Sequence, residues 1–468
     1  MKRLVFGVAG CVVVGLGVAL WLGQRAAGPT VDALEEELDA CRAAGMTMDR
    51  ADLVPPAVPE ADNGAPALAA AAEAVRAPSE WPQEVRDGWQ AAIYTLGEAW
   101  TAEERSQAQA VVTYLEDVLG KVDAACRKPR FRANIDYSAT FPDAGDLLGT
   151  MNLGRALAMR GRLQVARGDG GGALVSAGSA IGLAESRKDE PMIMSFMARA
   201  MVLGQASGLL ERVLDARNVG PEALAAIDER LPRRESIHAQ AQRALNGEML
   251  CLLGDGISQL RPLKPGLQKR LLSEDLVFCL GRFRRNWVRA GTARHAWPDA
   301  GMTDPEPGRG LWSSLLPSFW RVLKLRDVAV AQVEMARIAV ALERRRAADG
   351  ACPESLDALR LPDGQAPPED PFGGRPYRYE RAGDGYRLWS VGPDLKDDGG
   401  EEPADTVFAV RVPEVPAESA GATETEAAGK QPTEKPSPTS GSTSWREYWR
   451  ERMDKKRREE QGGGEAAE

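Results

Sequence analysis

Residues 145–185 decide the fold that we expect, and they read GDLLGTMNLGRALAMRGRLQVARGDGGGALVSAGSAIGLAE. Their large apolar side chains recur three or four residues apart, which is the spacing of one helix face. Gly168-Asp169 interrupts this pattern and is typical of a turn between two helices. A third apolar helix follows over about residues 191–216, and Pro191 is well suited to its first turn. The sequence therefore predicts helices packed as hairpins.

The small residues of this stretch carry a resemblance, and they are Ala156, Gly161, Gly168, Asp169 and Ala173. Their spacing is similar to that of a tetratricopeptide repeat, in which small side chains let two paired helices pack closely. The match covers one repeat, lacks the Tyr and terminal Pro positions of that family, and has no counterpart elsewhere in the chain. The resemblance implies a tetratricopeptide-like helical body.

Composition also favours a mainly helical protein. Aromatic residues make up only 6% of the 468 residues, and Ala, Gly, Leu, Arg and Glu dominate. The net charge of −9 argues against nucleic-acid binding, which normally leaves a basic footprint. The six cysteines form no CxxC pair, and the two histidines lie in no HxxxH or HExxH spacing. We therefore expect neither a disulfide framework nor a metal held by histidines.

The N-terminal segment predicts a membrane anchor. Residues 4–23 carry no charge and follow Lys2 and Arg3. At about 1.5 Å per residue this run spans roughly 30 Å, which is the thickness of the hydrocarbon core. The positive-inside rule puts the N-terminus in the cytoplasm. We therefore expect a single-pass protein of a bacterial inner membrane with most of its mass in the periplasm.

Two kinds of processing stay open for this segment. A signal peptidase would cut after residues 23–27, GQRAA, where Arg25 or Gln24 occupies the −3 position and makes a poor site. Residues 8–11, VAGC, match a lipobox, so lipid attachment to Cys11 is the other alternative.

A stripe of small residues gives the anchor a candidate pairing face, and it consists of Gly7, Cys11, Gly15, Ala19 and Gly23. Such small-xxx-small stripes let two membrane helices approach closely. The stripe predicts a homodimer through the transmembrane helix, although a Gly- and Ala-rich segment also produces such stripes by chance.

We divide the chain into five parts. They are a cytoplasmic start and anchor over 1–28, a juxtamembrane helix and Pro-rich linker over 29–66, a helical domain over 67–316, a small α+β module over 317–412, and a tail over 413–468. The tail is rich in Pro, Glu, Thr and Ser, so we expect it to be disordered. Its residues 445–453 have the spacing of a short amphipathic segment.

The module begins with a predicted long helix over 319–348 that ends at Asp349-Gly350. DPFGGRPYRY follows at 370–379 and YRLWSVGPDLKDDGG at 386–400. These residues predict two short strands, 376–381 and 385–391, joined by a tight turn. We expect the long helix to pack against both strands.

These motifs resemble the C-terminal module of the major pseudopilin of type II secretion. That module has a DPWGxPY turn, a short strand and an SxGxDGKxGG loop that binds calcium. The resemblance implies a calcium site whose side-chain ligands are Asp394, Asp397, Asp398 and Asp405. Leu395 stands where the family has a glycine.

The chain departs from pseudopilins at its start. It has no prepilin peptidase site, and about 300 residues separate its anchor from the module. Its whole architecture resembles uncharacterised membrane-anchored helical proteins of Planctomycetes and related bacteria. That resemblance rests on CRAAG at 41–45 with the Pro-rich stretch after it, on Gly168-Asp169 and on the pseudopilin-like end. It implies no particular activity.

Three functions follow as hypotheses. We expect a non-enzymatic envelope protein that acts through protein contacts in secretion or envelope organisation. A periplasmic hydrolase using carboxylates such as Glu248, Asp394 or Asp397 is the alternative, although no catalytic spacing supports it. A component similar to a secretion pseudopilin is the third.

The basic and aromatic residues of 278–287 indicate either an anion site or the coat of a helix face, and we favour the latter.

Overall fold

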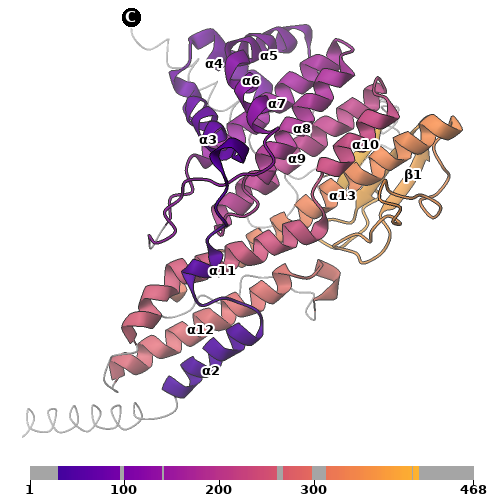
Figure 1. The fold of residues 1–468 in the computed structure, drawn as a ribbon. Helices are drawn as coiled ribbons and strands as arrows, with labels where there is room; N and C mark the ends of the chain where they lie inside the picture. Colours follow the sequence, from indigo (N-terminus) through magenta and orange to yellow (C-terminus); the bar gives the residue numbers. More distant parts are fainter. Residues whose placement is uncertain are drawn as a thin grey trace, which may run out of the picture. The chain divides into compact units, whose positions relative to one another are not determined.

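The computed structural model describes residues 30–94, 100–139, 142–260, 267–297, 312–402 and 404–410. These described residues all belong to one compact unit. Its described part is mainly helical with one small three-stranded sheet, which confirms the predicted fold class at this level (Figure 1). The predicted anchor over 4–23 and the predicted tail over 413–468 lie outside the described residues.

The helices and strands follow each other in a simple order. The first group is α2 (Thr30–Ala43), α3 (Ala65–Ala74), α4 (Gln83–Tyr94), α5 (Ala102–Tyr114) and α6 (Glu116–Ala125). The second is α7 (Leu147–Ala166), α8 (Gly170–Glu185), α9 (Ile193–Ala216), α10 (Pro221–Arg230), α11 (Arg234–Leu260), α12 (Leu267–Ala290) and α13 (Phe319–Asp349). The strands are β1 (Arg378–Ala382), β2 (Gly385–Ser390) and β3 (Thr406–Val410).

The predicted hairpin consists of α7 and α8, and α9 packs against both (Figure 1). Aspartates cap both helices of the hairpin, since Asp146 accepts a hydrogen bond from the Gly149 amide at 2.7 Å and Asp169 accepts one from Gly172 at 2.8 Å. A Cβ atom built at Gly161 would lie 2.5 Å from Cδ2 of Leu209. This small residue therefore lets α7 and α9 cross closely.

The expected start of the third helix is wrong by two residues. Helix α9 begins at Ile193 after Met192, so Pro191 precedes the helix instead of lying in its first turn. The reason is a long-range contact: a Cβ built at Gly247 of α11 would lie 1.8 Å from the carbonyl oxygen of Pro191. The chain before α9 therefore runs directly against the backbone of α11.

Helix α9 is, within the described residues, the one long and apolar enough to cross a membrane. However, 67% of its most apolar window is buried inside the protein, against α7, α8 and α13. We interpret α9 as a core helix, because its apolar face already has protein partners.

Helix α12 contains residues 278–287, for which the sequence favoured a helix face without giving the bounds of a helix. It packs between α11 and α2, with Leu276, Leu280 and Phe283 fully buried. The ring of Phe283 meets that of Phe319 edge-to-face at 5.0 Å. Nε of Arg284 donates to Oε1 of Glu37 on α2 at 2.7 Å. The basic and aromatic residues of 278–287 therefore coat a helix, as we expected.

The three strands form an antiparallel sheet in the order β1-β2-β3. Gly383 and Asp384 make the tight turn between β1 and β2, and Gly383 has the positive φ of 62° that such a turn requires. Tyr386 and Leu388 of β2 are fully buried, and Phe408 of β3 is nearly so. The sequence predicted the first two strands but not the third, β3.

Buried polar contacts join the sheet to the helices. Oη of Tyr377 donates to Oε2 of Glu334 on α13 at 2.7 Å, and Nε of Arg234 on α11 donates to Oε1 of the same carboxylate at 2.8 Å. Oη of Tyr386 donates to the carbonyl of Ala339 at 3.2 Å. At the far edge, the Ala409 amide of β3 donates to Glu211 of α9 at 3.4 Å. The sheet and the helices therefore share one core.

Replacing Glu334 should destabilise the protein strongly. Glu334→Ala leaves the Tyr377 hydroxyl and Arg234 without their buried partner, which typically costs about 3–5 kcal/mol. Glu73→Ala is the control, because its ion pair with Arg76 leaves both side chains more than 60% exposed and such pairs contribute at most about 1 kcal/mol. Urea unfolding of the full chain in detergent, followed by tryptophan fluorescence, measures both. Equal losses for the two variants would contradict the role of Glu334.

The pH dependence of stability should report on Glu211. Burial raises the pKa of Glu211 to about 7, although Arg212 lowers it. The folded state therefore holds the proton of Glu211 more tightly than the unfolded chain does. Protonated Glu211 contributes fully to the free energy of unfolding below about pH 4.5, and this contribution is lost as the pH rises through about 7. Glu211→Gln, which keeps the acceptor for Ala409, should gain on the order of 2 kcal/mol over the native chain at pH 8 and nothing at pH 4. Urea midpoints at both pH values check this, and a pH-independent difference would contradict it.

Candidate functional site

The four predicted calcium ligands lie on the loop between β2 and β3. Asp394, Asp397 and Asp398 are exposed, whereas Asp405 is buried. Asp397 is already engaged within the module: its Oδ1 accepts a hydrogen bond from Nε1 of Trp389 at 2.9 Å, and its Oδ2 accepts one from Nε of Arg378 at 2.6 Å. These two bonds hold the pKa of Asp397 below its usual value.

Asp405 has the most unusual environment of the four. Only 2% of it is exposed, and its Oδ2 accepts a hydrogen bond from the Gly400 amide at 2.7 Å. Its Oδ1 is buried and has no hydrogen-bond partner among the described residues. Burial, followed by the charges of Asp397 and Asp398, raises the pKa of Asp405. The fold therefore brings three of the four carboxylates close enough to repel one another.

The loop backbone is bent at several positions. Gly392, Gly399 and Gly400 have positive φ angles, and so does Leu395, at 65°. A left-handed conformation is costly for a leucine, and glycine is the residue that adopts it freely. The position at which the sequence departs from the pseudopilin loop is thus one whose backbone favours glycine.

The carboxylates do not form a ready-made ligand set. Within the part of the chain that the structure describes, no three His, Cys, Asp or Glu side chains are arranged to hold a metal. The unpartnered oxygen of Asp405 fits a calcium ligand, but both oxygens of Asp397 are used by Trp389 and Arg378. A calcium ion would need further oxygen ligands from Asp394, Asp398 and the loop carbonyls.

The carboxylates named for a hydrolase do not share one environment. Glu248 lies on α11, where burial alone raises its pKa. Asp394 accepts a hydrogen bond from the Lys396 amide at 3.2 Å, and Asp397 bonds within the module. Among the described residues, the hydrogen bonds of Asp394 and Asp397 are with residues of the module and not with Glu248.

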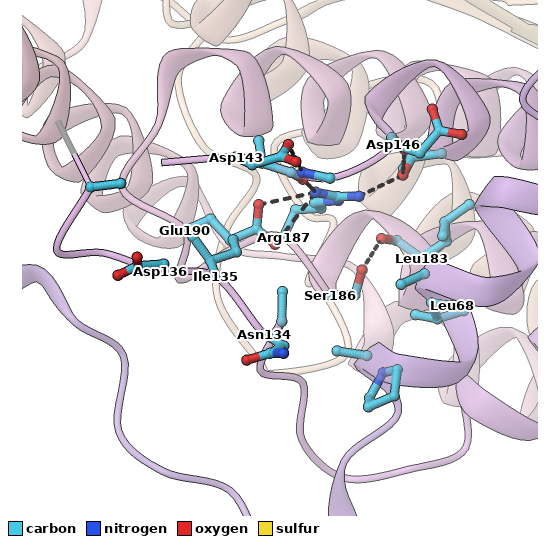
Figure 2. Close-up of a pocket in the computed structure, with 18 residues that line it drawn as sticks. Leu68, Asn134, Ile135, Asp136, Asp143, Asp146, Leu183, Ser186, Arg187 and Glu190 are labelled. Carbon is cyan, nitrogen blue, oxygen red and sulfur yellow. Dashed lines mark hydrogen bonds and ion pairs between the residues drawn. The ribbon is translucent and has the colours of Figure 1, made fainter. Parts of the chain in front are cut away.

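A pocket of about 470 Å³ lies elsewhere, between the start of α3, the loop 133–146, the start of α7 and the segment after α8 (Figure 2). Its walls are mostly small or apolar, with Leu68, Ile135 and Leu183 among them. This volume is in the range of pockets that hold small molecules. The sequence reasoning missed this pocket, because the loop has no periodic pattern and its partners are distant in the chain.

Arg187 organises the pocket and is 8% exposed. Its Nη1 donates to the carbonyl of Ala144 at 2.6 Å and to Oε2 of Glu190 at 3.1 Å, and its Nη2 donates to Oγ1 of Thr150 at 2.8 Å. Behind it, the Arg187 carbonyl accepts a hydrogen bond from Nε2 of Gln240 on α11 at 2.6 Å. One side chain thus ties the loop and α7 to the chain between α8 and α9.

Glu190 is the buried partner of this arginine, with 4% of its surface exposed. Burial raises the pKa of Glu190, although Arg187 lowers it. Asp136, Asp143 and Asp146 add three further carboxylates to the lining. The pocket therefore combines apolar walls with an excess of negative charge.

Comparison of the chain with protein-family models, with curated proteins and with solved structures finds no match. The resemblances to the pseudopilin module, to the tetratricopeptide repeat and to the Planctomycetes proteins therefore stay predictions from the residues that carry them. The calcium site stays a prediction in the same way.

Proposed function

We propose that this chain is a non-enzymatic, membrane-anchored envelope protein. Residues 4–23 hold it in a bacterial inner membrane with the N-terminus in the cytoplasm. The remainder is periplasmic and acts as a scaffold that presents a small pseudopilin-like module. Its partners are other proteins of secretion or of envelope organisation.

The observation that carries this proposal is the rigid attachment of the module. Glu334 of α13 bonds both Tyr377 beside the sheet and Arg234 of α11, and both contacts are partly or fully buried. Across the turn between β1 and β2, Nη1 of Arg217 donates to Oδ2 of Asp384 at 2.9 Å. A scaffold needs such a fixed orientation between its body and the surface that it presents.

The surface that the module presents supports protein contacts. Strand β1 is an edge strand, and Glu380 and Arg381 on it are exposed. An edge strand offers unpaired backbone groups to a partner, while its charges limit unspecific pairing. The acidic loop 392–405 lies at the other end of β2 and is also largely exposed.

The order of elements in the module supports the pseudopilin-like interpretation. A long helix, α13, is followed by an antiparallel hairpin, an acidic loop and a further strand. We extend the proposal to calcium, which the loop would bind through Asp405 together with Asp394, Asp397 and Asp398. The buried, unpartnered oxygen of Asp405 supports this, because a buried carboxylate oxygen is stabilised by a cation or a donor.

Calcium should stabilise the full chain in detergent. A ligand at about 100 times its Kd adds about 2.7 kcal/mol, so the Tm of a chain of this length should rise by roughly 3 °C. Asp405→Asn should lose this shift, whereas Asp357→Asn, in an exposed turn of the same module, should keep it. Thermal unfolding with calcium, with magnesium and with chelator measures the effect. No shift, or an equal shift with magnesium, would overturn the calcium site.

A second experiment tests the scaffold itself. The tagged full chain should fractionate with the inner membrane, resist extraction by carbonate and be cut by protease added to the periplasmic side. Crosslinking in the intact envelope should recover secretion or envelope proteins, and chelator or Asp405→Asn should reduce that recovery while Asp357→Asn leaves it unchanged. Recovery of the chain in the soluble fraction would sink the proposal, and so would the absence of any envelope partner.

A further inference from the structure

Helices α7 and α9 lie side by side and point in the same direction (Figure 1). A Cβ atom built at Gly154 of α7 would lie 2.1 Å from Oε1 of Gln205 on α9. Two turns further on, a Cβ at Gly161 would lie 2.5 Å from Cδ2 of Leu209. The residue numbers of the two helices rise together along the contact, so the pair is parallel.

Helices α9 and α13 are arranged in the same way. A Cβ at Gly204 of α9 would lie 3.0 Å from Oε1 of Gln332 on α13. Just beyond the end of α9, Nε of Arg217 lies 3.4 Å from Oε2 of Glu343. The three helices α7, α9 and α13 therefore form one parallel layer.

One side of this layer is covered, because α8 packs against α7 and α9 while α11 packs against α9 and α13. On the first halves of the three helices, the large side chains that remain accessible are mostly apolar. Those that form one surface are Leu148 and Met151 on α7, Met194, Met197 and Met201 on α9, and Val328 on α13. We call this surface the methionine face.

The methionine face is well exposed. Leu148 is 50% exposed, Met194 is 55% exposed and Met201 is 37% exposed, and the other three side chains are partly exposed. The methionines of α9 recur three or four residues apart, so they follow one stripe of the helix. Single exposed apolar side chains are ordinary, but a continuous apolar surface over three adjoining helices is typical of a protein contact.

Methionine also indicates the kind of contact. Its side chain is unbranched and polarisable, so a surface rich in methionine adapts to the side chains of a partner. Parallel helices leave ridges and grooves between them, into which the apolar stripe of another helix can pack. The methionine face therefore suits an amphipathic helix.

The charged side chains beside the face are basic. Within residues 147–166, 191–210 and 319–333, each charged side chain that is not buried is an arginine or a lysine. Arg155, Arg321 and Lys324 are the ones next to the face. The acid in these ranges, Asp327, is fully buried and paired with Arg326.

The acids at the borders of the face are already engaged. Asp146 caps α7 through the Gly149 amide, and Glu211, ten residues beyond Met201, accepts from the Ala409 amide. The charge around the face therefore favours an acidic partner. A second copy of the same face is disfavoured, because a two-fold contact would bring the basic side chains of both copies together.

We propose that the methionine face binds an amphipathic helix of another envelope protein. Apolar side chains of that helix, spaced i, i+3, i+4 and i+7, pack against Met194, Met197 and Met201. Its Asp and Glu side chains lie along the edges of the face and pair with Arg321 and Lys324 on α13 and with Arg155 on α7. This inference rests on the scaffold function and adds the docking surface and the chemistry of the partner.

Fluorescence anisotropy with the full chain in a non-ionic detergent tests the binding. The probe is a labelled peptide of about 15 residues with leucine at i, i+3, i+4 and i+7 and glutamate at the flanking positions. It should bind saturably, above a blank of detergent alone, and at least about tenfold more tightly than the same peptide with lysine in place of glutamate. A peptide of equal composition with its leucines at alternate positions is the control for the helical pattern. Absence of saturable binding, or equal binding of the three peptides, would overturn the proposal.

A substitution on the face locates the binding. Met201→Glu places a negative charge where the acidic peptide packs, and it should weaken the binding of that peptide about tenfold. Val175→Glu is the matched control, because Val175 is 51% exposed on α8, outside the face. Its affinity should stay within about twofold of the native chain, and equal effects of the two substitutions would exclude the methionine face.

Charge reversal tests the chemistry of the partner independently of stability. A chain with both Arg321→Glu and Lys324→Glu should bind the glutamate peptide more weakly and the lysine peptide more tightly than the native chain does. Loss of folded protein cannot strengthen the binding of either peptide. An unchanged preference for the glutamate peptide would contradict the assigned role of Arg321 and Lys324.

Two further outcomes separate this inference from its rivals. Dihexanoyl phosphatidylglycerol, a soluble anionic lipid, should not displace the glutamate peptide. Saturable displacement by this lipid, with no preference between the peptides, would assign the face to an anionic membrane surface instead. In the intact envelope, Met201→Glu should reduce the recovery of crosslinked partners while the chain stays in the inner membrane. Unchanged recovery would overturn the methionine face alone, whereas a native chain found in the soluble fraction would count against the scaffold function.

Discussion

Burial of charge along α13 is the constraint on which the rest of the structure depends. Helices α9, α10 and α11 and the sheet cover much of this helix, and they bury five of its charged side chains, Arg326, Asp327, Glu334, Arg337 and Glu343. Glu334 is paired with Arg234 of α11, and Arg337 is paired with Asp228 of α10 at 3.0 Å. A buried charge that loses its partner costs several kcal/mol. Helix α13 can therefore be buried only when α10 and α11 are in place around it.

The same constraint sets the position of the sheet. Tyr377 completes the hydrogen bonding of Glu334, and Tyr386 reaches the backbone of α13 at Ala339. Arg217, at the end of α9, contributes to the same joint: its Nε lies 3.4 Å from Oε2 of Glu343. Because helices on two sides hold the sheet, the exposed edge of β1 and the loop after β2 keep a fixed orientation. That is the property on which a scaffold function rests.

The acidic loop and the pocket share one physical feature. Each contains a carboxylate with a buried oxygen that has no partner among the described residues, Oδ1 of Asp405 in the loop and Oδ2 of Asp146 in the pocket. In the loop, neighbouring acids raise the negative potential, and hard oxygen ligands suit a metal ion. In the pocket, apolar walls adjoin the acids. The surroundings, not the carboxylate, make the two sites different.

Local signals in the sequence determined most helices and the hairpin of β1 and β2. Helix α13 begins at Phe319 and ends at Asp349 before Gly350, as predicted, since caps, turn residues and apolar spacing act within a few residues. The strand β3, the start of α9 and the bounds of α12 were decided only by the tertiary structure. Residues of α12 such as Arg282 are buried, and α12 packs against α2, which is distant in the chain. The sequence of α12 therefore does not show the separate apolar and polar faces of a surface helix. The four aspartates of the loop were predicted as calcium ligands from a resemblance to a loop motif, which can be seen because they lie close together in sequence. The pocket was not, because its acids meet Arg187 only after segments distant in the chain have packed together, and no local pattern records such a meeting.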